Sequence, residues 1–208
     1  MITAGQALER LRSGNRRFAA GSGGGTVASR LRRAELAVGQ EPFAVVLGCS
    51  DSRVPAEIVF DQGLGDLFVI RVAGNIVAAS QIGSVEFAVE RFGSPLVVVL
   101  GHSRCGAVLA TLDELTRPAD YQSRGLLFIV DRVRPSVEAL LATELRSDPQ
   151  ALVAQAVRAN VRASVNHLRR GSRILEEHLQ DGRLVVVGAE YSLESGIVEF
   201  FDGPMGAA

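Results

Sequence analysis

The chain has 208 residues, of which 47% are hydrophobic and 22% charged, and its formal net charge is −1. This length and composition predict a single domain, residues 1–208, with a substantial core. The balanced charge argues against a nucleic-acid binder. All 22 basic residues are arginine, which excludes phosphate loops and Schiff-base chemistry that depend on lysine.

The sequence also carries signals about location. No run of about eighteen apolar residues occurs, so we expect no membrane span. The first 18 residues include charged side chains and lack the apolar stretch of a secretory signal, which favours a cytoplasmic protein. Cys49 and Cys105 are the only cysteines. In a reducing compartment, two cysteines favour metal binding or chemistry over a disulfide.

The first forty residues are typical of a helical arm. Helical spacing of apolar residues predicts a helix over residues 4–20. Residues 21–26 are rich in glycine and serine and predict a flexible connection. A short basic helix follows over residues 29–39, and we expect it to end at Gly39. We therefore divide the domain into an arm, residues 1–40, and a core, residues 41–208.

Four apolar runs in the core predict buried strands, at residues 43–49, 67–74, 96–102 and 184–191. Continuous runs of valine, isoleucine and leucine are typical of parallel strands that are covered on both faces. Helical patterns lie between them, at residues 80–93, after Cys105, and from about residue 124 to residue 180. The alternation predicts an α/β fold with a mostly parallel central β-sheet flanked by helices.

Two of the predicted strands lead directly into residues suited to metal binding. Cys49 and Asp51 follow the first strand, while His102 ends the third and Cys105 follows it. Functional groups gather at the carboxyl ends of parallel strands, so these four side chains converge if the two strands are neighbours. Two thiolates, an imidazole and a carboxylate suit tetrahedral zinc. The sequence therefore predicts a zinc site at this edge of the sheet.

The motifs CSDSRVP (residues 49–55) and GHSRCGAV (residues 101–108) resemble those of the β-class carbonic anhydrases. GNRRF (residues 14–18) and FDQGLGDLFVIRVAGN (residues 60–75) extend the resemblance over nearly the whole chain. It implies the fold of that class and the zinc-dependent, reversible hydration of carbon dioxide to bicarbonate and a proton by attack of zinc-bound hydroxide. It also implies one zinc ion per subunit and a homodimer or homotetramer.

The resemblance implies roles for individual residues. Cys49, His102 and Cys105 match the permanent zinc ligands. Asp51 either takes the fourth zinc position or pairs with Arg53, whose planar guanidinium suits a bidentate carboxylate.

Three further positions match residues around the substrate. Gln40 and Phe68 match positions that line the substrate pocket, commonly from the partner subunit. Gly106 matches a residue whose backbone N–H lies near the substrate. The pattern departs from the family at Val46, where members that bicarbonate regulates carry a tryptophan, so such regulation stays open here.

Three alternative functions remain at this stage. A hydrolase of the same fold that acts on carbonyl sulfide or carbon disulfide has the same ligand set. A zinc-binding protein without catalysis is a second alternative, although such a site needs neither the Asp51–Arg53 pair nor Gln40. A redox pair of Cys49 and Cys105 is a third, but these residues lie far apart in the sequence and form no C-x-x-C motif.

Overall fold

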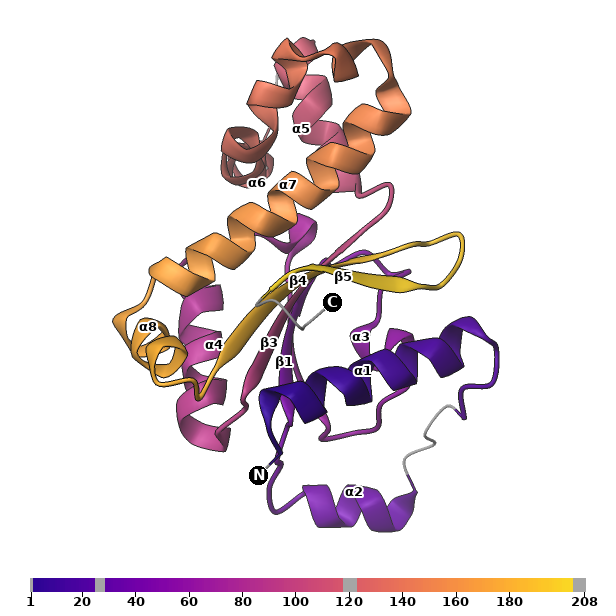
Figure 1. The fold of residues 1–208 in the computed structure, drawn as a ribbon, viewed down its shortest axis with the longest axis vertical. Helices are drawn as coiled ribbons and strands as arrows, with labels where there is room; N and C mark the ends of the chain where they lie inside the picture. Colours follow the sequence, from indigo (N-terminus) through magenta and orange to yellow (C-terminus); the bar gives the residue numbers. More distant parts are fainter. Residues whose placement is uncertain (1, 25–28, 118–122, 204–208) are drawn as a thin grey trace.

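The computed structural model describes residues 2–24, 29–117 and 123–203, which form a five-stranded sheet with helices on both faces (Figure 1). The strands are β1 (Ala44–Gly48), β2 (Leu67–Arg71), β3 (Leu96–His102), β4 (Val185–Tyr191) and β5 (Val198–Asp202). Their order is β2-β1-β3-β4-β5. All neighbours are parallel except β4 and β5, which are antiparallel. The mostly parallel sheet expected from the sequence is thus confirmed.

The helices fill the intervals between the strands. They are α1 (Ala4–Ala19), α2 (Arg30–Leu36), α3 (Ala56–Val59), α4 (Ala79–Phe92), α5 (Gly106–Thr116), α6 (Arg124–Val137), α7 (Pro149–Arg170) and α8 (Arg173–Gln180). Three short 3₁₀ turns are η1 (Ala73–Asn75), η2 (Glu138–Ala142) and η3 (Glu144–Ser147). Side chains of Thr3, Ser123, Asp148 and Ser172 cap the first turns of their helices, which fixes where those helices begin. Over the part of the chain that the structure describes, no helix combines the length and apolar character that a bilayer crossing requires.

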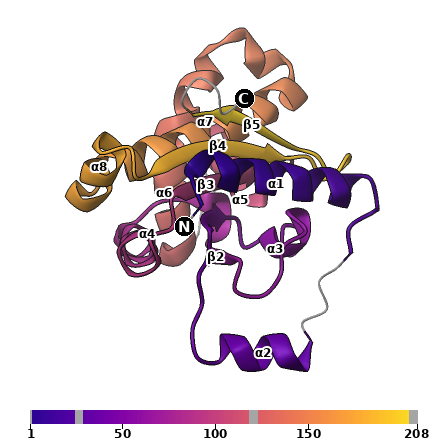
Figure 2. The same ribbon diagram turned by 60° about the horizontal axis from the view of Figure 1, so that its bottom comes forward.

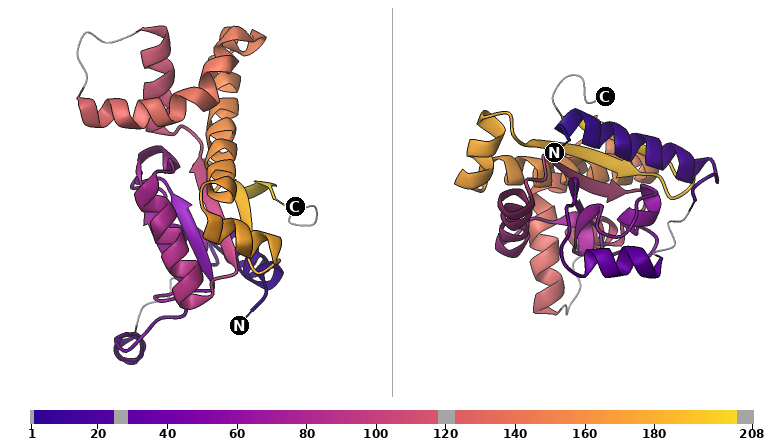
Figure 3. Two further views of the ribbon diagram at one scale, coloured as in Figure 1. Left: turned by 90° about the vertical axis from the view of Figure 1, so that its left-hand side faces the viewer. Right: turned by 90° about the horizontal axis from the view of Figure 1, so that it is seen from below.

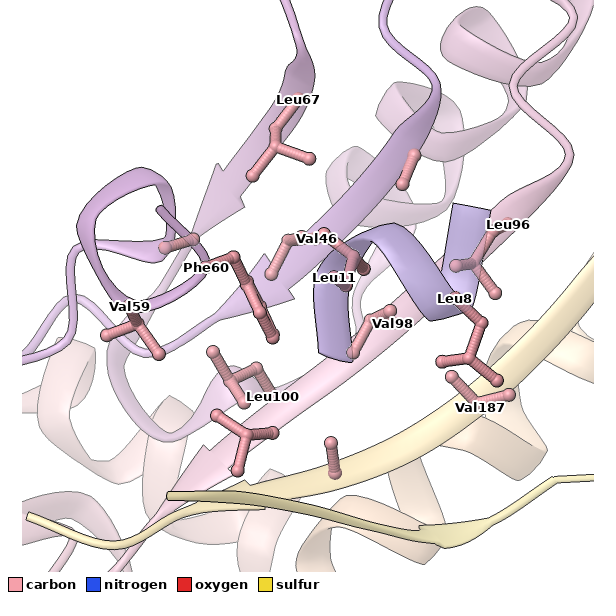
Figure 4. Close-up of a cluster of buried hydrophobic side chains, with 14 of the residues drawn as sticks. Leu8, Leu11, Val46, Val59, Phe60, Leu67, Leu96, Val98, Leu100 and Val187 are labelled. Carbon is pink, nitrogen blue, oxygen red and sulfur yellow. The ribbon is translucent and has the colours of Figure 1, made fainter. Parts of the chain in front are cut away.

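The two faces of the sheet are buried under different helices, because side chains alternate along each strand. Val46 and Val98 point to the face covered by α1 and α3 (Figure 4). Val45 and Val97 point to the opposite face, which is covered by α4, α7 and α8 (Figure 3). All four valines are fully buried. Coverage on both faces explains why these strands consist of continuous apolar runs rather than alternating ones.

The first helix, α1, is fastened to the core of its own chain. Asn15 donates from its side-chain amide to the carbonyl oxygens of Val59 (3.1 Å) and Gly196 (2.9 Å). A Cβ atom on Gly14 would lie 1.8 Å from the carbonyl oxygen of Phe60, so only glycine permits this approach. The second helix, α2, has no buried residue and lies apart from the sheet (Figure 2). The predicted arm therefore consists of a docked helix and a peripheral one.

Several boundaries differ from those expected from the sequence. The strand predicted over residues 67–74 ends at Arg71, because the chain turns into η1 at Gly74, whose φ is 70°. The basic helix ends at Leu36 and not at Gly39. The helical region at residues 124–180 is broken into α6, two 3₁₀ turns, α7 and α8. The short helix α3 and the antiparallel strand β5 had no counterpart in the sequence prediction, and the glycine-rich stretch at residues 21–26 lies partly outside the described residues.

The carboxyl ends of the parallel strands lie beneath α5, α6 and α7, which extend beyond the sheet (Figure 3). A third apolar cluster joins these helices to the strand ends and includes Cys49, Cys105 and Ile76. Because β1 and β3 are direct neighbours, with Gly48 opposite Leu100, the two predicted metal-binding segments leave the sheet side by side. This topology places the candidate site at a buried junction of the sheet and the helices.

Candidate metal centre

Three donor side chains meet at this junction. Cys49 directly follows β1, His102 is the last residue of β3, and Cys105 immediately precedes α5. Their ligand atoms all lie within 4.8 Å of one another, and all three residues are buried. The convergence predicted from the sequence is confirmed for these residues.

The imidazole of His102 is held in a state suited to a metal ion. Its Nδ1 lies 3.0 Å from the carbonyl oxygen of Ser103, so this nitrogen carries the proton and donates it. The side chain is 0% exposed, and Nε2 has no hydrogen-bond partner in the structure. A buried nitrogen without a partner costs about 1–3 kcal/mol. A metal ion at Nε2 removes that cost, and the bond at Nδ1 fixes the ring for it.

The two thiols form a coupled pair. A hydrogen bond from Cys105 holds the pKa of Cys49 well below its usual range, with help from His102 and from the backbone N–H groups of Asp51 and Gly74. The same bond, together with burial, raises the pKa of Cys105. Beside a divalent metal both thiols ionise. Two thiolates and a neutral imidazole are a donor set that fits zinc.

Asp51 lies beside these donors but is bound to Arg53. Its Oδ1 accepts from the backbone N (3.0 Å) and from Nε (2.9 Å) of Arg53, and its Oδ2 accepts from Nη2 (2.7 Å). The guanidinium keeps the pKa of Asp51 far below its ordinary value. Oδ2 lies 3.9 Å from His102 Nε2, which is too far for a hydrogen bond. Of the two states expected for Asp51, the structure holds the one paired with Arg53, with the carboxylate ionised at the edge of the donor set.

The loop after β1 is fixed from the neighbouring strand. Arg71, the last residue of β2, donates from Nε to the carbonyl oxygen of Cys49 (3.0 Å) and from Nη2 to that of Asp51 (2.6 Å). Both contacts use backbone oxygens, so the side chains of Cys49 and Asp51 stay available. Val46, where the pattern departs from that of the resembling family, is buried in the apolar core.

Two residues of α7 that the sequence analysis missed support the site through the neighbouring turn η1. Asn160 on α7 donates to the carbonyl oxygen of Gly74 (2.8 Å), and Ser164 donates to that of Asn75 (2.9 Å). The Gly74 N–H in turn donates to Cys49 Sγ (3.4 Å). The signal was present in the sequence, because these polar residues, four apart, interrupt the apolar stripe of an amphipathic helix.

The segment between the second and third donors is tied to the β4–β5 turn. Ser103 Oγ donates to Glu194 Oε2 (3.0 Å) and accepts from the backbone N of Leu193 (3.0 Å). Arg104, whose φ is 55°, forms an ion pair with the same carboxylate (2.8 Å). No sequence pattern signals this contact, because Glu194 lies about ninety residues further along the chain.

The remaining predicted residues lie at different ends of the sheet. Gly106 begins α5 immediately after Cys105, and a first-turn amide has no acceptor within its own helix. Gln40 precedes β1 and lines a cavity of about 850 Å³ at the amino ends of the strands. Phe68 pairs in register with Val45, near the same end. A five-residue strand spans roughly 17 Å, so Gln40 does not reach the Cys49 of its own chain.

Comparison with known proteins places these features in one family. Residues 44–198 match the carbonic anhydrase family. Carbonic anhydrase 2 of Mycobacterium tuberculosis is 43% identical over 193 residues, covering 91% of this chain and 89% of that protein. The carbonic anhydrase of Mycolicibacterium smegmatis is 42% identical over 193 residues, covering 93% and 91%. The crystal structure of the β-carbonic anhydrase CafA of Aspergillus fumigatus matches with a TM-score of 0.74 at 28% identity, covering 94% of this chain and 89% of that one.

Proposed function

This chain belongs to the β-class carbonic anhydrases, and we propose that it hydrates carbon dioxide reversibly at one zinc ion per subunit held by Cys49, His102 and Cys105. The observation that carries the proposal is the buried His102 Nε2, which lacks a partner and lies within 4.8 Å of two sulfurs. The closeness of both thiols to this nitrogen supports the same conclusion, because zinc binds cysteine as the thiolate.

Zinc bound here would make a water molecule more acidic and so supply hydroxide, an effect that reaches about pH 7 in a three-histidine carbonic anhydrase and that two thiolates would weaken. The residues of this chain direct that chemistry. Asp51 is ionised and accepts hydrogen bonds only, so its Oδ2 holds the proton of the attacking oxygen and turns a lone pair toward the carbon. Arg53 holds this carboxylate with two side-chain bonds and one backbone bond.

The product is an anion, and the start of α5 is suited to it. The backbone N–H groups of Ala107 and Val108 donate to the Cys105 sulfur, whereas the N–H of Gly106, the first residue of this eleven-residue helix, has no acceptor within the helix, whose dipole favours negative charge there. We assign the N–H of Gly106 to the oxygen of carbon dioxide that becomes negative during the reaction. Gly106 carries no side chain, and a Cβ atom at this position would meet nothing within 4 Å.

Gln40 and Phe68 act on substrate only from a second chain, because both lie toward the amino ends of the strands. We therefore propose a homodimer or homotetramer in which these residues complete the site of a neighbour. Aromatic contacts join Phe68 to Phe87 at 6.2 Å between ring centroids, and Phe87 is exposed. On this proposal an isolated, folded subunit has no activity, so light scattering that finds an active monomer refutes it.

The protein is proposed to work as one domain, residues 1–208, in the cytoplasm. Two zinc-binding thiols support this location, because a reducing compartment keeps them from oxidising. Asp51 and Arg53 have no task in a purely structural zinc site.

The experiment that tests the function is stopped-flow hydration of carbon dioxide by protein of known zinc content, with carbon disulfide hydrolysis measured in parallel. We expect hydration in proportion to bound zinc and little hydrolysis of carbon disulfide. A Cys105→Ser variant serves as the control, because it removes one ligand with little change in volume. Stoichiometric zinc without hydration at any pH contradicts the proposal and favours a non-catalytic site, whereas faster hydrolysis of carbon disulfide favours the alternative enzyme.

A further inference from the structure

The helix α7 buries two polar side chains in an otherwise apolar stripe. Asn160 and Ser164 lie among valines and leucines that pack on β3 and β4. Burying an amide or a hydroxyl costs free energy unless it is hydrogen-bonded. Each of these side chains donates a hydrogen bond to a backbone carbonyl oxygen of η1. Asn160 donates to that of Gly74, and Ser164 donates to that of Asn75. These two hydrogen bonds therefore attach α7 to the short turn η1.

That turn has an uncommon conformation. Gly74 has φ 70° and ψ 16°, and Asn75 has φ 45°, so two successive residues are left-handed. Asparagine adopts this conformation more readily than other residues with a side chain, but less readily than glycine. Asn75 is also buried, and its Nδ2 has no hydrogen-bond partner in the structure. A turn with this conformation and an unpaired buried amide persists only because surrounding contacts stabilise it. Such turns are common at functional sites.

The geometry of the turn directs one N–H at a metal ligand. The amide of Gly74 donates to Cys49 Sγ at 3.4 Å, while the carbonyl oxygen of the same residue accepts from Asn160 at 2.8 Å. Gly74 is thus fixed on both sides, by the sulfur and by the helix. A Cβ atom on Gly74 would lie 3.0 Å from the Cβ of Ala107, so α5 also packs closely against this residue.

We propose that Asn160 is a positioning residue for the zinc site, which acts by holding Gly74 so that its N–H donates to the Cys49 sulfur. This inference rests on the zinc site of the proposed function and adds a residue outside the ligand set. A hydrogen bond to a thiolate draws electron density from the sulfur and fixes its direction toward the metal. Without Asn160 the sulfur is a stronger electron donor, but it is held less firmly.

The test replaces zinc by cobalt(II), whose sulfur-to-metal charge-transfer absorption reports on the thiolates directly. The variants are Asn160→Ala and Asn160→Leu, of which the second keeps the branched shape and fills the space. We expect the absorption band to move to lower energy in both variants, because the electron leaves an unbonded sulfur more easily. Competition with a chelator should show a loss of about tenfold in zinc affinity, as is typical when a support of a metal ligand is removed.

Asn15→Ala is the matched control. Asn15 is 4% exposed and Asn160 is 2% exposed, and each donates from Nδ2 to backbone carbonyl oxygens. Asn15 fastens α1 and touches no part of the metal site. We expect Asn15→Ala to lower the stability of the protein while its cobalt spectrum and zinc affinity stay those of the wild type. A band shift of equal size in the control overturns the proposal.

A measurement on the wild type needs no variant to fold. In protein loaded with cadmium-113, a hydrogen bond from Gly74 to the metal-bound sulfur gives a scalar coupling between the Gly74 amide proton and the metal. The absence of this coupling overturns the inference, as do Asn160 variants with an unchanged band. If either result is found and the cobalt-loaded wild type still shows sulfur charge transfer, only the role of Asn160 is refuted and the proposed zinc site is supported. A wild type without that absorption overturns the zinc site and this inference together.

Discussion

The pair of Asp51 and Arg53 allows catalysis and stability to be separated by one substitution. Arg53→Ala removes the Nε and Nη2 donors and leaves only the backbone N of residue 53 on Asp51 Oδ1. Oδ2 loses its guanidinium partner at a distance of 3.9 Å from His102 Nε2. The carboxylate then turns toward the donor set and takes the position that the reacting water requires.

The size of the effect follows from exposure and geometry. The Arg53 side chain is 54% exposed, and ion pairs of that kind add little to stability. Misplacement of a catalytic group by about 1 Å costs roughly a hundredfold in rate. We therefore expect Arg53→Ala to lower kcat for hydration by about a hundredfold, while the melting temperature changes little.

The matched control is Arg17→Ala. Arg17 is 47% exposed and binds Asp61 at 2.6 Å, compared with 2.7 Å between Arg53 and Asp51, but it lies on α1, away from the donors. The assays are stopped-flow hydration at equal zinc content and thermal unfolding of both variants. The reasoning is refuted if the two variants lose activity equally, or if the fall in activity of Arg53→Ala matches a comparable fall in melting temperature.

Four further outcomes are expected. Gly14→Ala should lower the free energy of unfolding by about 1–3 kcal/mol in urea titrations, because its Cβ meets a backbone oxygen at 1.8 Å, whereas Gly5→Ala in the same helix should raise it by up to about 1 kcal/mol. Leu100→Ala should lower it by about 2–5 kcal/mol, because this side chain is fully buried, and a smaller loss in the same titration contradicts the core packing. Hydration activity should rise toward alkaline pH, because two thiolates cancel the charge of the ion and weaken its effect on water, so a rate that is flat from about pH 6 to about pH 9 argues against this donor set. The pKa of Asp51 is lowered by Arg53, so the stabilisation by this pair is present above the ordinary aspartate pKa and is lost only as pH falls through the lowered value. Carbon-13 NMR should therefore find Asp51 ionised at about pH 4, and titration near the ordinary value contradicts the pairing.

The sequence predicted those features of the fold that depend on repeated local patterns. The four parallel strands consist of apolar runs because both faces of the sheet are covered, and burial of Val45 and Val46 on opposite faces confirms that interpretation. Strand β5 escaped prediction because it pairs antiparallel at the edge of the sheet and is only partly buried. The end of β2 was placed three residues too late, because the turn at Gly74 depends on contacts with α7 rather than on local sequence.

The site could be predicted as far as its ligands and no further. Cys49, His102 and Cys105 lie at strand ends, and the topology of parallel sheets brings such positions together. The supports of the site come from distant parts of the chain. Asn160 and Glu194 reach the metal-binding segments through contacts that span about ninety residues; the break in the apolar stripe of α7 marks Asn160 as unusual but does not name its partner, and nothing in the sequence marks Glu194. The proposed role of Gln40 likewise depends on a second chain, which a sequence pattern does not describe.

X-ray absorption at the zinc edge of the purified, active protein tests the central claim most directly. The account predicts a zinc shell with two sulfur atoms at about 2.3 Å and one imidazole nitrogen at about 2.0–2.1 Å, completed by one light atom from solvent. In the Cys49→Ser and Cys105→Ser variants one of the two sulfur contributions should disappear. A wild-type shell made only of nitrogen and oxygen, or one with a single sulfur atom, contradicts the account.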